Sequence, residues 1–147
     1  MNNRYEAFTI LILRINRSIQ NIKQHEMKEY GLKGIHATIL FLLLNKEEGL
    51  SVSLLSKITK DDKGAISKAV AKLNELNYVL IKSPKYNGKI TLTDKGKEIA
   101  YSVEKKISKA VDEGGFGLDD DKRALLYEML TLICENLEKY DQELESK

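Results

Sequence analysis

Lysine is the residue type whose number and spacing could carry chemistry in this chain. Ten lysines lie between residues 57 and 97 against four carboxylates, so this segment carries a net charge of +6. Residues 1–56 carry +2, and residues 98–147 carry −6. The lysine-rich segment is either a solvated surface or a surface that attracts the phosphates of nucleic acid, and charge alone does not separate the two.

Metal and enzyme chemistry are poorly represented. His25 and His36 are the only histidines, and they lie on either side of a predicted helix break, whereas a metal site needs several converging ligands. The chain shows no nucleophile–base arrangement and no phosphate-binding glycine loop. We therefore expect no enzyme activity, no metal and no cofactor.

Composition bounds the class of protein. The chain has 147 residues, of which 42% are hydrophobic and 31% charged, as in globular proteins. Its longest apolar run, residues 39–44, is far too short to span a bilayer, and the run at residues 10–13 is too short for the core of a signal peptide. The single cysteine, Cys134, cannot form an internal disulfide and lies within an apolar pattern, so we expect a buried thiol. We expect a cytoplasmic protein that does not enter a membrane.

Apolar stripes predict an amphipathic helix at each end of the chain. In segments 4–30 and 119–145 apolar residues recur at spacings of three and four, the period of helix-on-helix packing. The stripes consist of Tyr5, Phe8, Ile12, Ile15, Ile19 and Ile22, and of Leu126, Leu130, Ile133, Leu137, Tyr140 and Leu144. The two helices could cover the middle of their own chain. We favour a bundle shared with a second copy, because the middle has its own core pattern.

Two short helices joined by a tight turn are predicted in the middle of the chain. Ser51 and Asp62 are residue types that cap helix N-termini, and each precedes a segment with apolar periodicity. The second of these helices extends to about Asn77. A turn of about four residues between two helices predicts a helix-turn-helix, whose second helix enters the major groove of DNA.

A β-hairpin is predicted directly after the second helix. The β-forming segments 78–83 and 89–93 flank Asn87-Gly88, a pair typical of hairpin turns. Thr93 can cap a connecting helix over 94–111, and glycines between residues 112 and 118 predict a break before the last helix. The predicted fold is mainly α with a small β-hairpin wing: a winged helix-turn-helix over 35–93, with N- and C-terminal helices that form a dimerisation bundle.

The order of these elements resembles the MarR (multiple-antibiotic-resistance regulator) family of bacterial transcription factors. The resemblance covers nearly the whole chain, and its last motif is similar to the family's leucine-threonine-x-x-glycine signature at the end of the wing. The motifs are Tyr30-Gly31-Leu32, Leu54-Leu55-Ser56-Lys57, residues 65–73 and Leu92-Thr93-Asp94-Lys95-Gly96. The resemblance implies a single MarR-like domain over 1–147 that binds double-stranded DNA as a homodimer. It also implies repression at a pseudo-palindromic operator, with release by a small-molecule effector whose identity the sequence does not give.

One departure from the family keeps an alternative open. Family wings carry an arginine that enters the minor groove, whereas no arginine lies between Arg17 and Arg123 here. Lysine meets a phosphate as a point charge and cannot make a planar bidentate contact. The alternative is a winged-helix protein-interaction module that reads DNA weakly or without specificity.

The predicted site residues fall into two groups. We expect Lys68 to read a guanine edge, Ser67 to reach a base or a phosphate, and the wing lysines to contact phosphates. For Ser51, helix capping alone is an equally open reading. The predicted DNA-binding residues are Ser51, Ser53, Lys63, Ser67, Lys68, Lys72, Lys85, Tyr86 and Lys89. The predicted dimerisation residues are Phe8, Ile12, Ile15, Ile19, Leu126, Leu130, Ile133, Leu137 and Tyr140.

Overall fold

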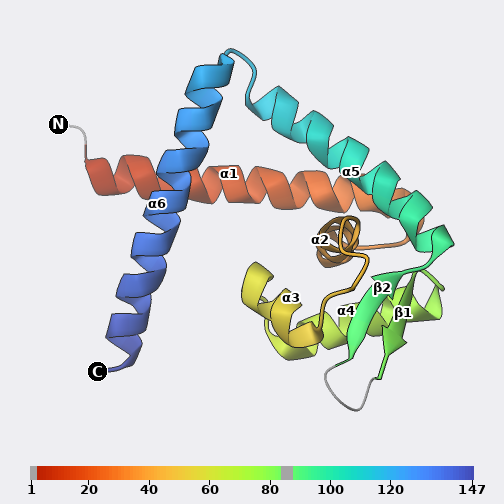
Figure 1. Cartoon of the computed structure of the whole chain (residues 1–147). Helices are drawn as coiled ribbons and strands as arrows, with labels where there is room; N and C mark the ends of the chain where they lie inside the picture. Colours follow the sequence, from red (N-terminus) through yellow and green to blue (C-terminus); the bar gives the residue numbers. More distant parts are fainter. Residues whose placement is uncertain (1–2, 84–87) are drawn as a thin grey trace. The chain divides into compact units, whose positions relative to one another are not determined.

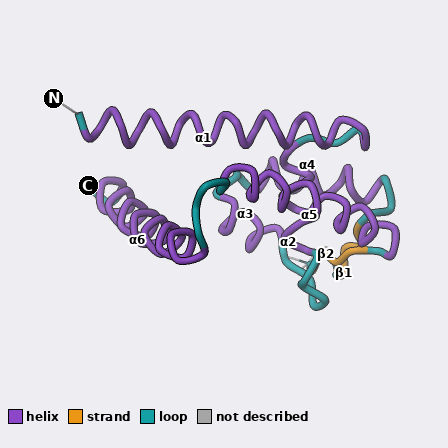
Figure 2. Tube along the Cα trace, turned by 90° about the horizontal axis from the view of Figure 1, so that it is seen from above, coloured by secondary structure: helices purple, strands orange, loops and turns teal. Residues whose placement is uncertain are grey.

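A computed structural model describes residues 3–83 and 88–147, which divide into two compact units. Unit 1 comprises Met1–Ala110 and unit 2 comprises Val111–Lys147. Figure 2 shows that helices dominate the described chain and that its strands form one short hairpin. The predicted fold class, mainly α with a small hairpin, is confirmed.

Unit 1 carries the helix-turn-helix and the hairpin (Figure 1). Its elements are α1 (Arg4–Met27), the 3-10 turn η1 (Lys28–Tyr30), α2 (Gly34–Leu43), α3 (Val52–Thr59), α4 (Lys63–Glu75), β1 (Val79–Lys82), β2 (Lys89–Leu92) and α5 (Asp94–Gly114), whose last turn lies in unit 2. The first helix thus ends at Met27, where the sequence predicted a helix over 4–30, and Gly31 follows with a left-handed φ of 65°.

The core of unit 1 lies beneath the helix-turn-helix. α2 is the most apolar helix and buries residues on most of its turns, as expected of a helix covered by several neighbours. The largest fully buried side chains are Met27, Ile39, Leu40, Leu43, Leu55, Ile66, Leu73, Ile90, Val79 and Val103. Because α3, α4 and both strands contribute to this one cluster, the helix-turn-helix and the hairpin share a single close-packed core.

The hairpin is antiparallel, and Leu50 forms an isolated β-bridge to its second strand. Its register pairs Val79 with Leu92 and Lys82 with Lys89. Leu50 extends the sheet, because its N–H donates to the carbonyl of Ile90 at 3.1 Å and its own carbonyl accepts from Ile90 N–H at 2.9 Å. Residues 83–88 connect the two strands, and the predicted turn residue Asn87 lies outside the described residues.

A tight corner connects α4, the hairpin and α5. The Thr93 hydroxyl donates to the Asn77 carbonyl at 2.6 Å and accepts from Gly96 N–H at 2.9 Å, so Thr93 caps α5 as predicted. Asn77 has a left-handed φ of 61°. Gly96 packs against the backbone of Tyr78 so closely that a Cβ would overlap the Tyr78 carbonyl oxygen. The leucine-threonine-x-x-glycine motif is therefore the sequence that this corner requires.

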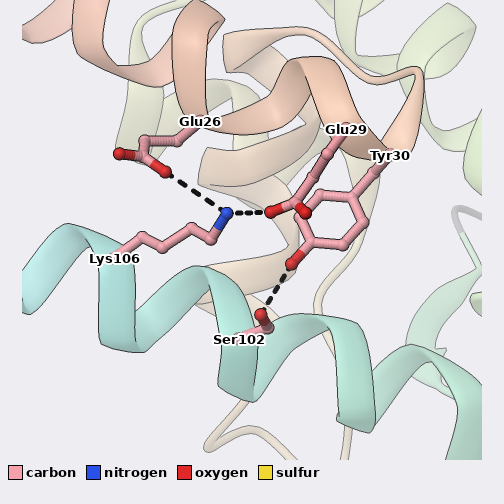
Figure 3. Close-up of polar contacts among 5 residues, drawn as sticks. All are labelled: Glu26, Glu29, Tyr30, Ser102 and Lys106. Carbon is pink, nitrogen blue, oxygen red and sulfur yellow. Dashed lines mark hydrogen bonds and ion pairs between the residues drawn. The ribbon is translucent and has the colours of Figure 1, made fainter.

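A polar cluster fastens the end of α1 and η1 to α5 (Figure 3). Lys106 of α5 pairs with Glu26 at 3.2 Å and with Glu29, and its ammonium lies 5.2 Å from the centre of the Tyr30 ring. The Tyr30 hydroxyl and the Ser102 hydroxyl share a hydrogen bond of 2.6 Å. The contact to Lys106 lowers the pKa of Glu29 and, through Glu29, raises the pKa of Lys106. These contacts join the middle of α5 to the end of α1 and to η1, within unit 1.

Unit 2 consists of the end of α5, a glycine-containing turn and α6 (Asp120–Glu145). The Asp119 side chain caps α6 by accepting from Lys122 N–H at 2.9 Å, and Asp120 and Asp121 lie in the first turn, where the helix dipole favours negative charge. Gly117 takes a left-handed φ of 91° in the turn. α6 has no buried residue.

The expectation of a buried cysteine thiol is wrong for this chain by itself. Cys134 is exposed on α6, and its thiol lies 3.3 Å from a carboxylate oxygen of Glu138, one turn further along the helix. The apolar pattern around Cys134 predicted burial, but no element of the described chain covers this face of α6.

Candidate nucleic-acid interface

α4 presents a continuous exposed face with a basic character. Ile66, Ala69, Val70 and Leu73 turn into the core, which leaves the opposite side of the helix uncovered. The exposed residues of α4 are Lys63, Gly64, Ser67, Lys68, Ala71, Lys72, Asn74 and Glu75. The structure therefore places the four predicted residues of this helix, Lys63, Ser67, Lys68 and Lys72, on one solvent-facing side.

The turn between α3 and α4 is held by its own side chains. Lys60 ends α3 with a left-handed φ of 65°, and its N–H donates to the Ser56 carbonyl at 2.8 Å. The Ser56 hydroxyl donates to the Asp61 carbonyl at 2.6 Å, and Thr59 accepts from Asp61 N–H at 3.2 Å. Asp62 then caps α4, accepting from Ala65 N–H at 2.7 Å, as the sequence predicted. This network fixes the angle at which α4 leaves α3.

The serines at the start of α3 differ in their accessibility. Ser51 is only 9% exposed, and its hydroxyl accepts from Leu54 N–H at 3.1 Å, so it serves as the predicted N-cap. Its side chain is thus occupied within the protein. Ser53 is half-buried in the first turn of the same helix.

A buried histidine lies beneath the basic helix. His36 of α2 is 7% exposed, and its Nδ1 accepts from Lys33 N–H at 2.9 Å. Burial, followed by the positive charges of Lys72 and Lys33, lowers the pKa of His36 below its ordinary value. The lowered pKa favours the neutral imidazole of His36, which adds no positive charge beside Lys72.

The wing residues predicted at the tip lie largely outside the described chain. Lys85 and Tyr86 are among the residues 84–87 that the structure does not describe. Lys89 is exposed at the start of β2 and stands directly opposite Lys82, which is also exposed. Lys82 was not among the predicted DNA-binding residues. It precedes the predicted turn just as Lys89 follows it, and this position was the signal that could have identified it.

The predicted dimerisation residues remain uncovered in the single chain. On α1, Phe8, Ile12, Ile15 and Ile19 are 40–55% exposed. On α6, Leu126, Leu130, Leu137 and Tyr140 are 37–58% exposed, and Ile133 is half-buried. Apolar side chains in such number on one helix require a covering surface.

Residues 3–83 and 88–147 contain no group of three or more histidine, cysteine or acidic side chains arranged to hold a metal ion. None of the helices in this part of the chain combines the length and apolar character of a membrane span.

Known proteins match this chain in structure rather than in sequence. No family profile matches the sequence, and no curated protein does. A MarR transcriptional regulator from Methanosarcina mazei Go1 superposes with a TM-score of 0.83 at 24% identity, over 95% of this chain and 94% of that one. A putative MarR-family regulator from Listeria monocytogenes, solved in complex with a 26mer DNA, gives 0.77 at 20% identity, over 93% and 90%. CouR from Rhodococcus jostii RHA1, bound to p-coumaroyl-CoA, gives 0.76 at 18% identity, over 86% and 90%.

These matches extend over both the winged helix-turn-helix and the terminal helices. Their identities are low, so what they share with this chain is the arrangement of the backbone. The chain has the fold of the MarR-family transcriptional regulators.

Proposed function

We propose that this protein is a MarR-family transcriptional repressor that binds a pseudo-palindromic operator in double-stranded DNA as a homodimer. The observation that carries the proposal is the exposed basic face of α4, the second helix of a helix-turn-helix, on which Lys63, Lys68 and Lys72 lie together. A helix in this position enters the major groove in helix-turn-helix proteins. The Listeria regulator, which has the same fold, was solved with DNA.

The uncovered terminal helices support the homodimer. α6 is 26 residues long and buries none of them within the chain, although it carries leucines along its length. A second copy supplies an equivalent surface, because an isologous interface uses the same patch on both subunits. In such a dimer two copies of α4 would meet half-sites whose centres lie roughly 34–36 Å apart.

A binding titration tests the DNA-reading part of the proposal. The protein is titrated against the DNA upstream of its own gene and against a shuffled duplex, over a range of salt concentrations. We expect sequence-selective binding whose affinity falls steeply with salt, because lysine–phosphate contacts release counterions. The Lys68→Ala/Lys72→Ala variant should lose selective binding, while Lys105→Ala/Lys109→Ala, which removes the same charge from the exposed surface of α5, should retain it.

The same titration addresses the protein-interaction alternative. If the wild-type protein binds neither duplex selectively, or if the Lys68→Ala/Lys72→Ala variant controls its promoter as well as the wild type, α4 does not read DNA. The winged helix-turn-helix would then act on a protein partner.

Release by a small molecule completes the proposal. CouR, with the same fold, was solved with an acyl-coenzyme A ligand. We propose that an effector of unidentified structure weakens operator binding by this protein. A screen of small organic acids and acyl thioesters for displacement of labelled operator tests this, and the displaced fraction must follow effector concentration with saturation.

A further inference from the structure

The centre of the exposed face of α4 has few side chains that can hydrogen-bond. At helical spacing its midline consists of Gly64, Lys68, Ala71 and Glu75, directly opposite the buried residues of the helix. Lys63 and Lys72 lie toward the two edges of this face, where a helix in a groove meets the phosphates of the two walls. Glu75 lies at the C-terminal end, away from the N-terminal residues that contact base edges.

The side-chain group that typically reads adenine in the major groove is a carboxamide, and the carboxamide of α4 is already hydrogen-bonded within the protein. Asparagine or glutamine contacts adenine N6 and N7 with two hydrogen bonds. The only carboxamide of α4 is Asn74, whose Nδ2 donates to the Val79 carbonyl at 2.9 Å. This hydrogen bond joins α4 to β1, so the Asn74 amide is engaged in holding the fold.

Lys68 is the residue on the midline of α4 whose long side chain ends in a hydrogen-bond donor. A lysine ammonium in the major groove donates to guanine O6 and N7. One turn away on either side are Gly64, which has no side chain, and Ala71, which has only a methyl group. The backbone can therefore approach the base edges closely, and the Ala71 methyl can pack against the 5-methyl group of thymine.

We propose that α4 reads guanine through the Lys68 ammonium and a thymine methyl through Ala71, and reads no adenine through a carboxamide. This inference rests on the proposed function and specifies the base chemistry of its operator half-site. It follows from which side chains α4 presents and from the internal hydrogen bond that occupies Asn74.

Selection from random duplexes, followed by single-atom changes in the DNA, tests the inference. The wild-type protein is used to enrich binding duplexes, and each enriched guanine is then replaced by 7-deazaguanine, which lacks N7. One such replacement in each half-site should weaken binding on the order of 5- to 150-fold, as expected for loss of a good base contact. Deoxyuridine in place of one thymine should weaken binding several-fold, and 7-deazaadenine should have no effect in the base pairs that face Lys68 and Ala71.

A change of specificity provides the second readout. The Lys68→Gln variant carries a carboxamide, so selection with it should replace the enriched guanine by adenine at the same position. Lys46→Gln, an exposed lysine outside the helix-turn-helix, should return the wild-type motif. Unchanged thermal unfolding of both variants shows that they are folded.

The outcomes separate this inference from the proposed function. If no motif is enriched by the wild-type protein, the proposed function fails. If a motif is enriched but tolerates 7-deazaguanine, or is sensitive to 7-deazaadenine in the base pairs that face Lys68 and Ala71, only the base assignment is overturned. The same holds if Lys68→Gln selects the wild-type motif.

Discussion

At the scale of the residue, a few residues that bond or pack against the backbone of a neighbouring element set the geometry of the site. Thr93 and Gly96 close the corner between the hairpin and α5, and Asn74 joins α4 to β1. These residues were visible in the sequence only as a cap, a glycine of a motif and an ordinary helix residue. Their roles depend on backbone carbonyls that lie nearby only after folding.

Gly96→Ala should destabilise the protein. The new Cβ would meet the Tyr78 carbonyl oxygen, which is backbone and cannot move without disturbing the hairpin. We expect the free energy of unfolding to fall by about 1–3 kcal/mol, the range for overpacked sites, as measured by urea denaturation. Gly114→Ala is the matched control, since nothing lies within 4 Å of its Cβ position at the end of α5. An equal loss in the two variants would contradict the steric explanation.

His36 should make stability depend on pH. Burial and the charges of Lys72 and Lys33 lower its pKa in the folded protein, so the unfolded chain binds more protons once the pH falls below about 6.5. The stabilisation is complete above pH 6.5 and is lost as the pH falls toward the lower pKa of the folded state. Thermal unfolding midpoints of the wild type and of His36→Asn, measured between pH 7.5 and pH 5, should diverge in slope.

The Asn side chain of that variant keeps a hydrogen-bond acceptor near Lys33 N–H but does not titrate. His25→Asn serves as the control, because His25 is exposed on α1. A His36→Asn profile as steep as that of the wild type would assign the pH dependence to other groups.

At the scale of the element, the helix-turn-helix was predictable because the residues that begin its helices bond to their own near neighbours in the chain. Ser51 and Asp62 cap helices with their own neighbouring N–H groups, so residue type and position were enough to place them. The pairing of the wing strands was not local in this sense. The register that sets Lys82 opposite Lys89 depends on where each strand ends, which the β-forming residue types indicate only approximately.

Lys82 and Lys89, which face each other across the hairpin, should slightly lower the stability of the free protein and raise its affinity for DNA. Like charges directly opposite each other on a hairpin repel, and residues 76–93 contain no carboxylate to balance them. In Lys82→Thr/Lys89→Thr we expect an unchanged or higher unfolding midpoint. We also expect operator affinity to fall on the order of tenfold or more, with a shallower salt dependence, because each lost phosphate contact removes about 0.9 from the slope.

Phosphate contacts carry no base information, so the ratio of operator to shuffled-duplex affinity should be preserved in this variant. Lys82→Arg/Lys89→Arg keeps both charges and should bind at least as tightly as the wild type does. A wild-type salt slope in the threonine variant would show that the wing base does not touch the DNA backbone.

At the scale of the whole molecule, the terminal helices require a covering surface. Their apolar residues are exposed in the single chain, and the exposed state of Cys134 belongs to the same uncovered surface of α6. The polar cluster around Lys106 joins α5 to the end of α1 and to η1 within unit 1.

Charge placed on the apolar stripes should dissociate the dimer. Leu130→Glu on α6 puts a carboxylate among leucines that the partner would cover, and burying it unpaired is strongly unfavourable. We expect the dimer to dissociate at least tenfold more readily in sedimentation equilibrium, with a parallel loss of operator affinity. Gln142→Glu, on the opposite side of the same helix, should leave both unchanged. A Leu130→Glu variant that remains dimeric would place the interface elsewhere.

The sequence by itself determined the element order, the helix caps, the basic α4 and the apolar terminal stripes, because each rests on neighbouring residues and helical periodicity. Only the tertiary structure decided that the Asn74 amide bonds to the Val79 carbonyl and that Lys82 faces Lys89. It also decided that Gly96 cannot accept a side chain and that Lys106 binds two glutamates. These contacts join residues on different elements, and their geometry arises when the shared core of unit 1 brings those elements together. The proposed base contacts of α4 depend on both. The sequence places Lys68 on the exposed face of the helix, and the fold engages the Asn74 amide in a hydrogen bond to β1.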